Sequence, residues 1–125
     1  MRVLLVTDDT RYADELASAA SLRGVDLAQA AVGDDLDASV ALHVPNVVVL
    51  DAHDSLARTS RTATGFAALH PRIATVLIAK RAPERSVGSG LVFDKRFSAE
   101  RLLGELERAY LRLGPRDEMR RLAGE

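Results

Sequence analysis

The sequence predicts one α/β domain built around a parallel sheet of five strands. Short apolar runs alternate with segments of helical periodicity along most of the chain, which is the pattern of repeated strand–helix units. The strongest runs are continuous rather than alternating with polar residues, as expected for strands that helices cover on both faces. The length of 125 residues suits a single domain with a core of its own.

The composition excludes several classes of protein. Hydrophobic residues make up 47% of the chain and charged residues 28%, which is typical of a globular domain, and no apolar run approaches the ~20 residues of a membrane span. The chain has no cysteine, which rules out disulfides and thiolate metal sites. The apolar run at residues 3–6 is too short for a signal peptide. We therefore expect a cytoplasmic protein without a membrane partner, and the net charge of −1 disfavours nucleic acid as a partner.

The first strand–helix unit is predicted from residues 3–6 onward. These residues form the first strand, and the helix after it has apolar residues at i, i+3, i+4 and i+7. The stripe consists of Ala13, Leu16, Ala17 and Ala20. Gly24 ends this helix, and residues 25–32 form the second strand.

A second helix is predicted after Gly33. Asp34 is expected to be its N-cap, with Asp37 in an acidic first turn, and Pro45 ends it. Residues 47–50 give the strongest strand signal in the sequence, because they are an uninterrupted apolar run that begins with three β-branched valines.

A third helix is predicted before Pro71. Its apolar and aromatic positions are Ala63, Phe66, Ala67 and His70. Residues 73–79 form the fourth strand. Between residues 80 and 90, proline and glycine leave room for about two helical turns at most, so the fourth helix is short or missing.

The last unit begins with a brief fifth strand at residues 91–93. Ser98 then caps a long helix, and Gly114-Pro115 closes it. The apolar stripe of this helix is Leu102, Leu106, Ala109 and Leu113. Residues 115–125 are expected to form a short exposed tail.

Charged residues follow three of the predicted strands. Asp8 and Asp9 follow the first, Asp51 the third and Lys95 the fifth. In an open parallel sheet these positions meet beyond the carboxyl ends of the strands, where ligands bind. Carboxylates gathered there repel one another, and a hard cation such as Mg²⁺ relieves the repulsion. An ordinary structural role is open too, because aspartates favour helix N-termini.

Three blocks of sequence resemble the signature blocks of the response-regulator receiver family. They are VLLVTDD, VVVLDAHD and LVFDKRFSAERLLGEL, in that order. The resemblance extends from Met1 to about Leu113. It implies a flavodoxin-like, three-layer (βα)5 fold, with a receiver-like domain at residues 1–114 and the tail after it.

The resemblance also implies a function. Asp51 would accept a phosphoryl group from a histidine kinase or phosphotransfer protein, and Lys95 would contact that group. Asp8, Asp9, Asp51 and the backbone carbonyl of His53 would bind Mg²⁺. Signalling would then pass to a downstream protein partner, and the chain would not be an enzyme.

Five departures from the family pattern leave a second hypothesis open. The hydroxyl expected at the end of the fourth strand falls on Ala79, or on Lys80 in the adjacent register, and the switch aromatic of the fifth strand is Val92. Arg96 replaces the proline after the lysine, and Ser55-Leu56-Ala57 replaces a Pro-Gly motif. The fourth helix is shortened as well.

The second hypothesis is therefore a pseudo-receiver, a protein-interaction module that works without phosphorylation. In that case the ammonium of Lys80 could neutralise the acidic cluster, or it could simply be a solvated side chain. A flavodoxin-like enzyme or cofactor binder is disfavoured, because no Gly-rich phosphate loop follows the first strand.

Overall fold

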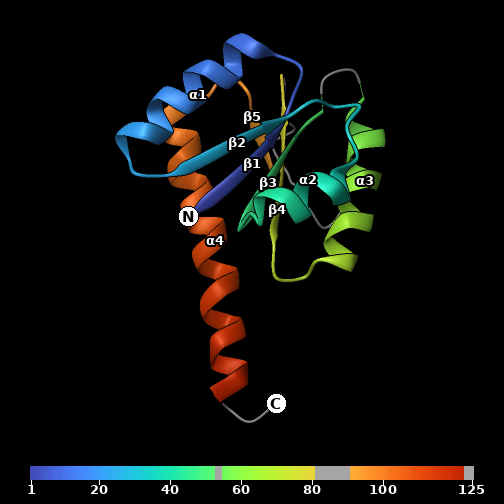
Figure 1. Ribbon diagram of the computed structural model, residues 1–125, viewed down its shortest axis with the longest axis vertical. Helices are drawn as coiled ribbons and strands as arrows, with labels where there is room; N and C mark the ends of the chain where they lie inside the picture. Colours follow the sequence, from blue (N-terminus) through green and yellow to red (C-terminus); the bar gives the residue numbers. More distant parts are fainter. Residues whose placement is uncertain (53–54, 81–90, 123–125) are drawn as a thin grey trace.

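The computed structural model describes residues 1–52, 55–80 and 91–122. Five strands form one parallel sheet in the order β2-β1-β3-β4-β5. The strands are β1 (Arg2–Val6), β2 (Asp26–Ala30), β3 (Val47–Asp51), β4 (Ala74–Ala79) and β5 (Leu91–Asp94). The helices are α1 (Thr10–Leu22), α2 (Leu36–His43), α3 (Leu56–Leu69) and α4 (Ala99–Leu122). α1 and α4 cover one face of the sheet and α2 and α3 the other (Figure 1), which confirms the predicted flavodoxin-like α/β fold.

The central strands contribute to two cores, one on each face of the sheet. Successive residues of a strand point to opposite faces. Val3 and Leu5 of β1 therefore pack with α1 and α4, whereas Leu4 and Val6 pack with α2 and α3. All residues of β3 are buried, as expected for a strand covered on both sides.

The register brings the ends of the strands to one edge of the sheet. Val6 of β1 lies beside Leu50 of β3. Ala79 of β4 lies beside Asp94 of β5. The residues that directly follow these positions therefore share the carboxyl edge, where parallel sheets bind ligands.

The N-cap of α2 differs from the prediction. Asp35, rather than Asp34, accepts the capping hydrogen bond, from the backbone N–H of Ala38 at 3.2 Å. The carboxylate of Asp34 accepts from the backbone N–H of Ala31 at 3.0 Å instead. Two consecutive aspartates offer the same chemistry, and the turn before the helix decides which one caps it.

The prediction that Gly114-Pro115 ends the last helix is wrong. α4 continues to Leu122, and Figure 1 shows its last turns running past the sheet. A proline inside a helix costs ~3 kcal/mol, because it removes one backbone hydrogen bond and clashes with the preceding turn. The segments on both sides consist mostly of strong helix formers, among them Leu, Arg, Glu and Met, so the helix continues.

The prediction of a short or missing fourth helix falls on residues 81–90, outside the described residues. In the segments that the structure describes, no helix is both long and apolar enough to cross a membrane.

Candidate functional site

A buried carboxylate lies at the carboxyl edge of the sheet. Asp51 is the last residue of β3, and its side chain is only 2% exposed. Its Oδ2 atom accepts a hydrogen bond from the Thr7 hydroxyl at 2.6 Å and another from the Lys95 ammonium at 2.8 Å. A charged donor and a neutral donor on one oxygen compensate for the burial of the carboxylate.

Backbone hydrogen bonds just past the strand ends position both donors. The Thr7 N–H donates to the Ala30 carbonyl at 3.0 Å and continues the β1–β2 ladder. The Lys95 N–H donates to the Ala79 carbonyl at 2.7 Å and continues the β4–β5 ladder. The sequence reasoning missed Thr7. Thr7 directly follows the buried residues of β1 and precedes two aspartates, and this position could have indicated that it belongs to the site.

Asp9 joins this cluster from the start of α1. It is the N-cap of the helix, and its Oδ1 atom accepts from the Tyr12 N–H at 3.1 Å. Its Oδ2 atom accepts from the Lys95 ammonium at 3.0 Å. These two hydrogen bonds lower the pKa of Asp9. Asp9 therefore caps α1 and also bonds Lys95, whereas its role as a metal ligand stays a prediction.

The electrostatics of Lys95 follow from its two carboxylate partners. Burial alone would lower its pKa, but the hydrogen bonds with Asp51 and Asp9 outweigh that effect and raise the pKa. The ring of Tyr12 also lies against the ammonium, with Nζ 5.1 Å from the ring centroid, within the range of a cation–π contact. Burial, assisted by the charges of Asp51 and Asp9, raises the pKa of the Tyr12 hydroxyl.

Asp8 does not join the cluster. Its Oδ1 atom accepts from the backbone N–H of Val32 at 3.0 Å, in the loop after β2. The predicted gathering of Asp8 with Asp9 and Asp51 is therefore not observed. Local hydrogen bonding explains the difference, because Asp9 accepts from the first turn of α1 whereas Asp8 accepts from the loop after β2.

The predicted Mg²⁺ shell of Asp8, Asp9, Asp51 and the His53 carbonyl stays a prediction. Within the described ranges, no group of three His, Asp or Glu side chains is placed to hold a metal ion. The Lys95 ammonium bridges the two carboxylates that do converge, those of Asp9 and Asp51, and so supplies the positive charge that a cation would bring. His53, whose carbonyl is the remaining predicted ligand, lies outside the described residues.

The end of β4 offers the site no hydroxyl. Ala79 is 7% exposed, and its side chain has no polar atom. Lys80 is exposed, and the ammonium that contacts the acids is that of Lys95. On β5, Val92 packs with the α2–α3 core and Phe93 with the α1–α4 core, which confirms that Phe93 points to the opposite face.

Arg96 has a structural role where the family pattern has proline. Its backbone N–H donates to Asp94 Oδ1 at 2.8 Å, and its guanidinium binds both oxygens of the same carboxylate, at 3.0 and 2.6 Å. Proline has no N–H and no cationic group, so it could make none of these contacts. They shape the turn that carries Lys95 into the site.

Comparison with known proteins identifies the fold. No protein-family model matches the sequence, and no curated protein does. Among solved structures, NtrX from Brucella abortus matches 99% of this chain with a TM-score of 0.77 and 24% identity. A CheY-like receiver domain from Methanospirillum hungatei JF-1 matches 92% of this chain and 97% of its own, with a TM-score of 0.74 and 18% identity. The chain has the receiver fold of response regulators.

A third structure with the receiver fold is described as an atypical orphan response regulator with a phosphorylation-independent regulatory mechanism. It matches 88% of this chain and 95% of its own, with a TM-score of 0.74 and 14% identity. This chain spans 30% of the NtrX chain, so it corresponds to one part of that protein. In the receiver fold, Asp51 and Lys95 lie at the ligand-binding edge of the sheet.

Proposed function

We propose that this chain is a receiver-fold interaction module that works without phosphorylation of Asp51. One observation carries the proposal: the Lys95 ammonium bridges Asp9 and Asp51 directly, at 3.0 and 2.8 Å. The site is thus supplied with a cation by the chain itself. A bridge of this kind holds the turn after β5 against the start of α1 without any added group.

The burial of Asp51 supports the same function. A carboxylate nucleophile must present an oxygen in line with the phosphorus that it attacks. The side chain of Asp51 is 2% exposed, and its Oδ2 atom accepts from both Thr7 and Lys95. Attack through Oδ2 would break a charge-assisted hydrogen bond in a buried place, which is costly.

A pre-formed module signals by binding a protein partner. Ala79 has no hydroxyl that a phosphoryl group could contact, and Val92 has no aromatic ring that could change position in response. A ligand shifts an equilibrium only by interacting differently with the two states. The phosphorylation-independent mechanism described for the orphan regulator with the same fold is a precedent for this kind of function.

The test is incubation with a small phosphodonor, such as acetyl phosphate, and Mg²⁺, followed by intact-mass spectrometry. We expect no added phosphoryl group on the wild-type chain, under conditions that fully modify a phosphorylatable receiver run in parallel. The Asp51→Asn variant is the matched control. An adduct on the wild-type chain that is lost in this variant would establish Asp51 as a phosphoryl acceptor and overturn the proposal.

Thermal unfolding with and without Mg²⁺ gives a second readout. A ligand that binds only the folded state raises the melting temperature by mass action. We expect no rise in millimolar Mg²⁺ beyond that in an equal concentration of Ca²⁺. A rise specific to Mg²⁺ that disappears in Asp9→Asn would show that the cation binds here after all.

A further inference from the structure

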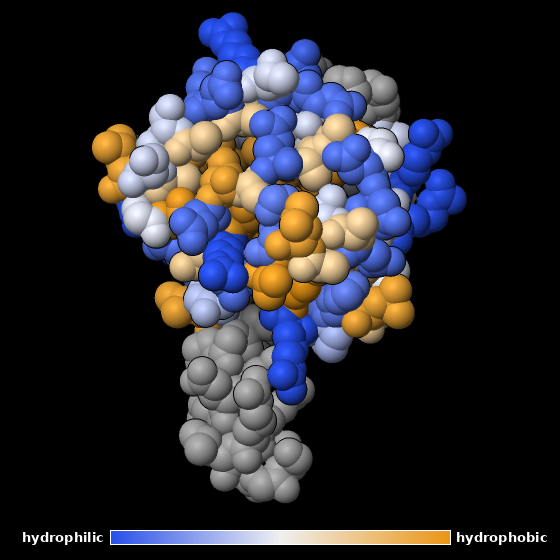
Figure 2. All heavy atoms as spheres, viewed as in Figure 1, coloured by the Kyte–Doolittle hydropathy of each residue, from blue (hydrophilic) through white to orange (hydrophobic). Residues whose placement is uncertain are grey.

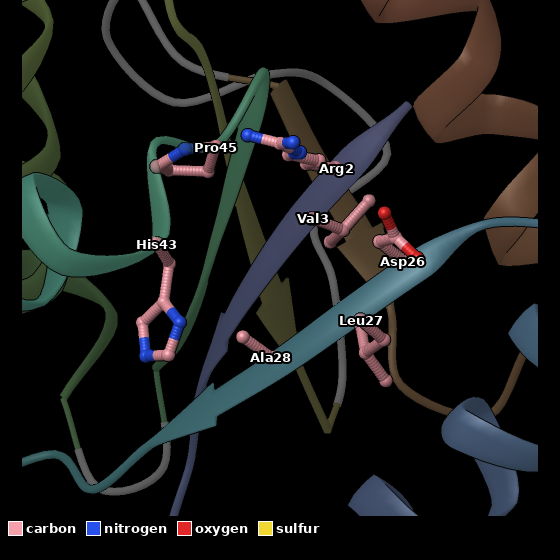
Figure 3. A pocket seen from close by; sticks show the side chains of 7 residues that line it. All are labelled: Arg2, Val3, Asp26, Leu27, Ala28, His43 and Pro45. Carbon is pink, nitrogen blue, oxygen red and sulfur yellow. The ribbon is translucent and has the colours of Figure 1, made fainter.

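Lys95 lines neither of two cavities on the described surface of the domain. One cavity, of about 190 Å³, opens at the amino ends of β1 and β2, beside the end of α2 (Figure 3). The other, of about 300 Å³, opens at the carboxyl ends of the same strands, where Thr7 and Asp8 line it. On the face of the domain that Figure 2 shows, hydrophilic side chains predominate and apolar ones form separate patches. Neither cavity therefore leads a small molecule to the Lys95 ammonium.

A side chain of α1 covers Lys95 instead. The Lys95 side chain is 13% exposed, and the centroid of the Tyr12 ring lies 5.1 Å from its Nζ atom. Tyr12 follows the N-cap Asp9 by three residues, and helical side chains lean toward the N-terminus of their helix. The ring and the Asp9 carboxylate therefore meet the ammonium from the same turn of α1, while Asp51 binds it from the sheet.

The ring of Tyr12 is held less firmly than the two carboxylates. It packs at the margin of the core between α1, α4 and the sheet, and it is only partly buried. Among the residues that the structure describes, its hydroxyl group has no hydrogen-bond partner. Rotation of this side chain therefore gives up packing and the contact with Lys95, but no hydrogen bond.

We propose that Tyr12 is a gate over this site, whose closed position keeps molecules in solvent away from the Lys95 ammonium. An external oxyanion that approaches the ammonium has to displace one of the groups bound to it. Displacing Asp9 or Asp51 breaks a charge-assisted hydrogen bond, whereas displacing the ring gives up a weaker cation–π contact. Opening therefore begins at Tyr12. The gate rests on the Lys95 bridge of the proposed function, and it adds a means of controlling access to that bridge.

Amine labelling tests the gate in the full chain, because Lys80 and Lys95 are its two lysines. Trace acetylation with N-hydroxysuccinimide acetate, followed by digestion and mass spectrometry, gives the rate at Lys95 relative to the rate at the exposed Lys80. We expect wild-type Lys95 to react about tenfold more slowly than Lys80, since its ammonium is bridged and covered. Tyr12→Leu keeps an apolar helix former and removes the ring, so the relative rate should rise roughly fivefold, as expected for the loss of a cation–π contact. Tyr12→Phe retains the ring and should keep the wild-type rate.

Tyr110→Leu is the matched control. Tyr110 is the other tyrosine of the chain and packs against the same core from α4, but the ring over Lys95 is that of Tyr12. We expect this variant to label like the wild type. An unchanged rate in Tyr12→Leu would overturn the gate and leave the bridge intact, and an equal rise in Tyr110→Leu or Tyr12→Phe would also overturn the gate. A wild-type Lys95 that reacts as fast as Lys80 would overturn the bridge itself, and with it the proposed function.

Discussion

At the scale of single residues, Lys95 has the largest predicted effect on stability. Its ammonium compensates two carboxylates, one of which is 2% exposed. Lys95→Met removes the cation and leaves both acids facing each other. We expect a loss of roughly 3–5 kcal/mol in the free energy of unfolding, the usual cost of breaking a buried pair by removing one partner, measured by urea denaturation.

The matched control for this change is Lys80→Met. Lys80 is an exposed lysine next to the same edge of the sheet, and its substitution should change stability by less than about 0.5 kcal/mol. Equal effects of the two substitutions would contradict the assigned role of Lys95.

The sequence could predict part of this site. Asp51 and Lys95 follow strands whose ends must meet, so their proximity follows from the fold. The separate fates of Asp8 and Asp9 could not be predicted, because they depend on which carboxylate reaches the Tyr12 N–H and which reaches the Val32 N–H. The role of Thr7 could not be predicted, because threonine is also common in strands that have no functional role.

At the scale of secondary-structure elements, hydrophobic pattern predicted the strands and helices well and the helix ends less well. Residues 47–50 of β3 are all apolar and buried, as expected for a strand that helices cover on both faces. Helix boundaries depend on smaller energies, such as those that select Asp35 over Asp34 as the cap or carry α4 through Pro115. Free-energy contributions of ~1–3 kcal/mol compete at helix ends, and the hydrophobic pattern does not show which of them is larger.

α4 provides the element-scale prediction. Leu106 is fully buried between the helix and the sheet, and Leu111 of the same helix is 59% exposed. Leu106→Ala should reduce the free energy of unfolding by roughly 2–5 kcal/mol, because it removes buried methyl groups and leaves a cavity. Leu111→Ala should cost less than about 0.5 kcal/mol. Denaturant midpoints of the two variants measure the difference, and similar midpoints would place the core of α4 elsewhere.

At the scale of the whole molecule, the alternation of strands and helices was sufficient to predict the fold. Five parallel strands with crossovers on both faces leave few arrangements that bury every apolar stripe. The turn after α2, at the amino edge of the sheet, could not be predicted, because it depends on where α2 ends and on the left-handed conformation of Val44. Neither is encoded in a periodic pattern.

The strand β1 has a thermodynamic consequence, because it separates the Asp51 site from the turn that follows α2. Thr7 directly follows its carboxyl end and donates to Asp51, the partner of Lys95, whereas Arg2 begins its amino end and bonds Asn46, two residues after Val44. Its five residues span about 17 Å at the usual rise of a strand. Sites farther apart than about 10 Å that share no partner behave independently. In the monomer, the stability changes caused by Lys95→Met and Val44→Gly should therefore sum in the double variant to within about 0.5 kcal/mol, as measured by urea denaturation at low concentration. A larger departure from additivity would mean that the sheet transmits strain from one edge to the other, so that events at Asp51 and at the turn after α2 are energetically coupled.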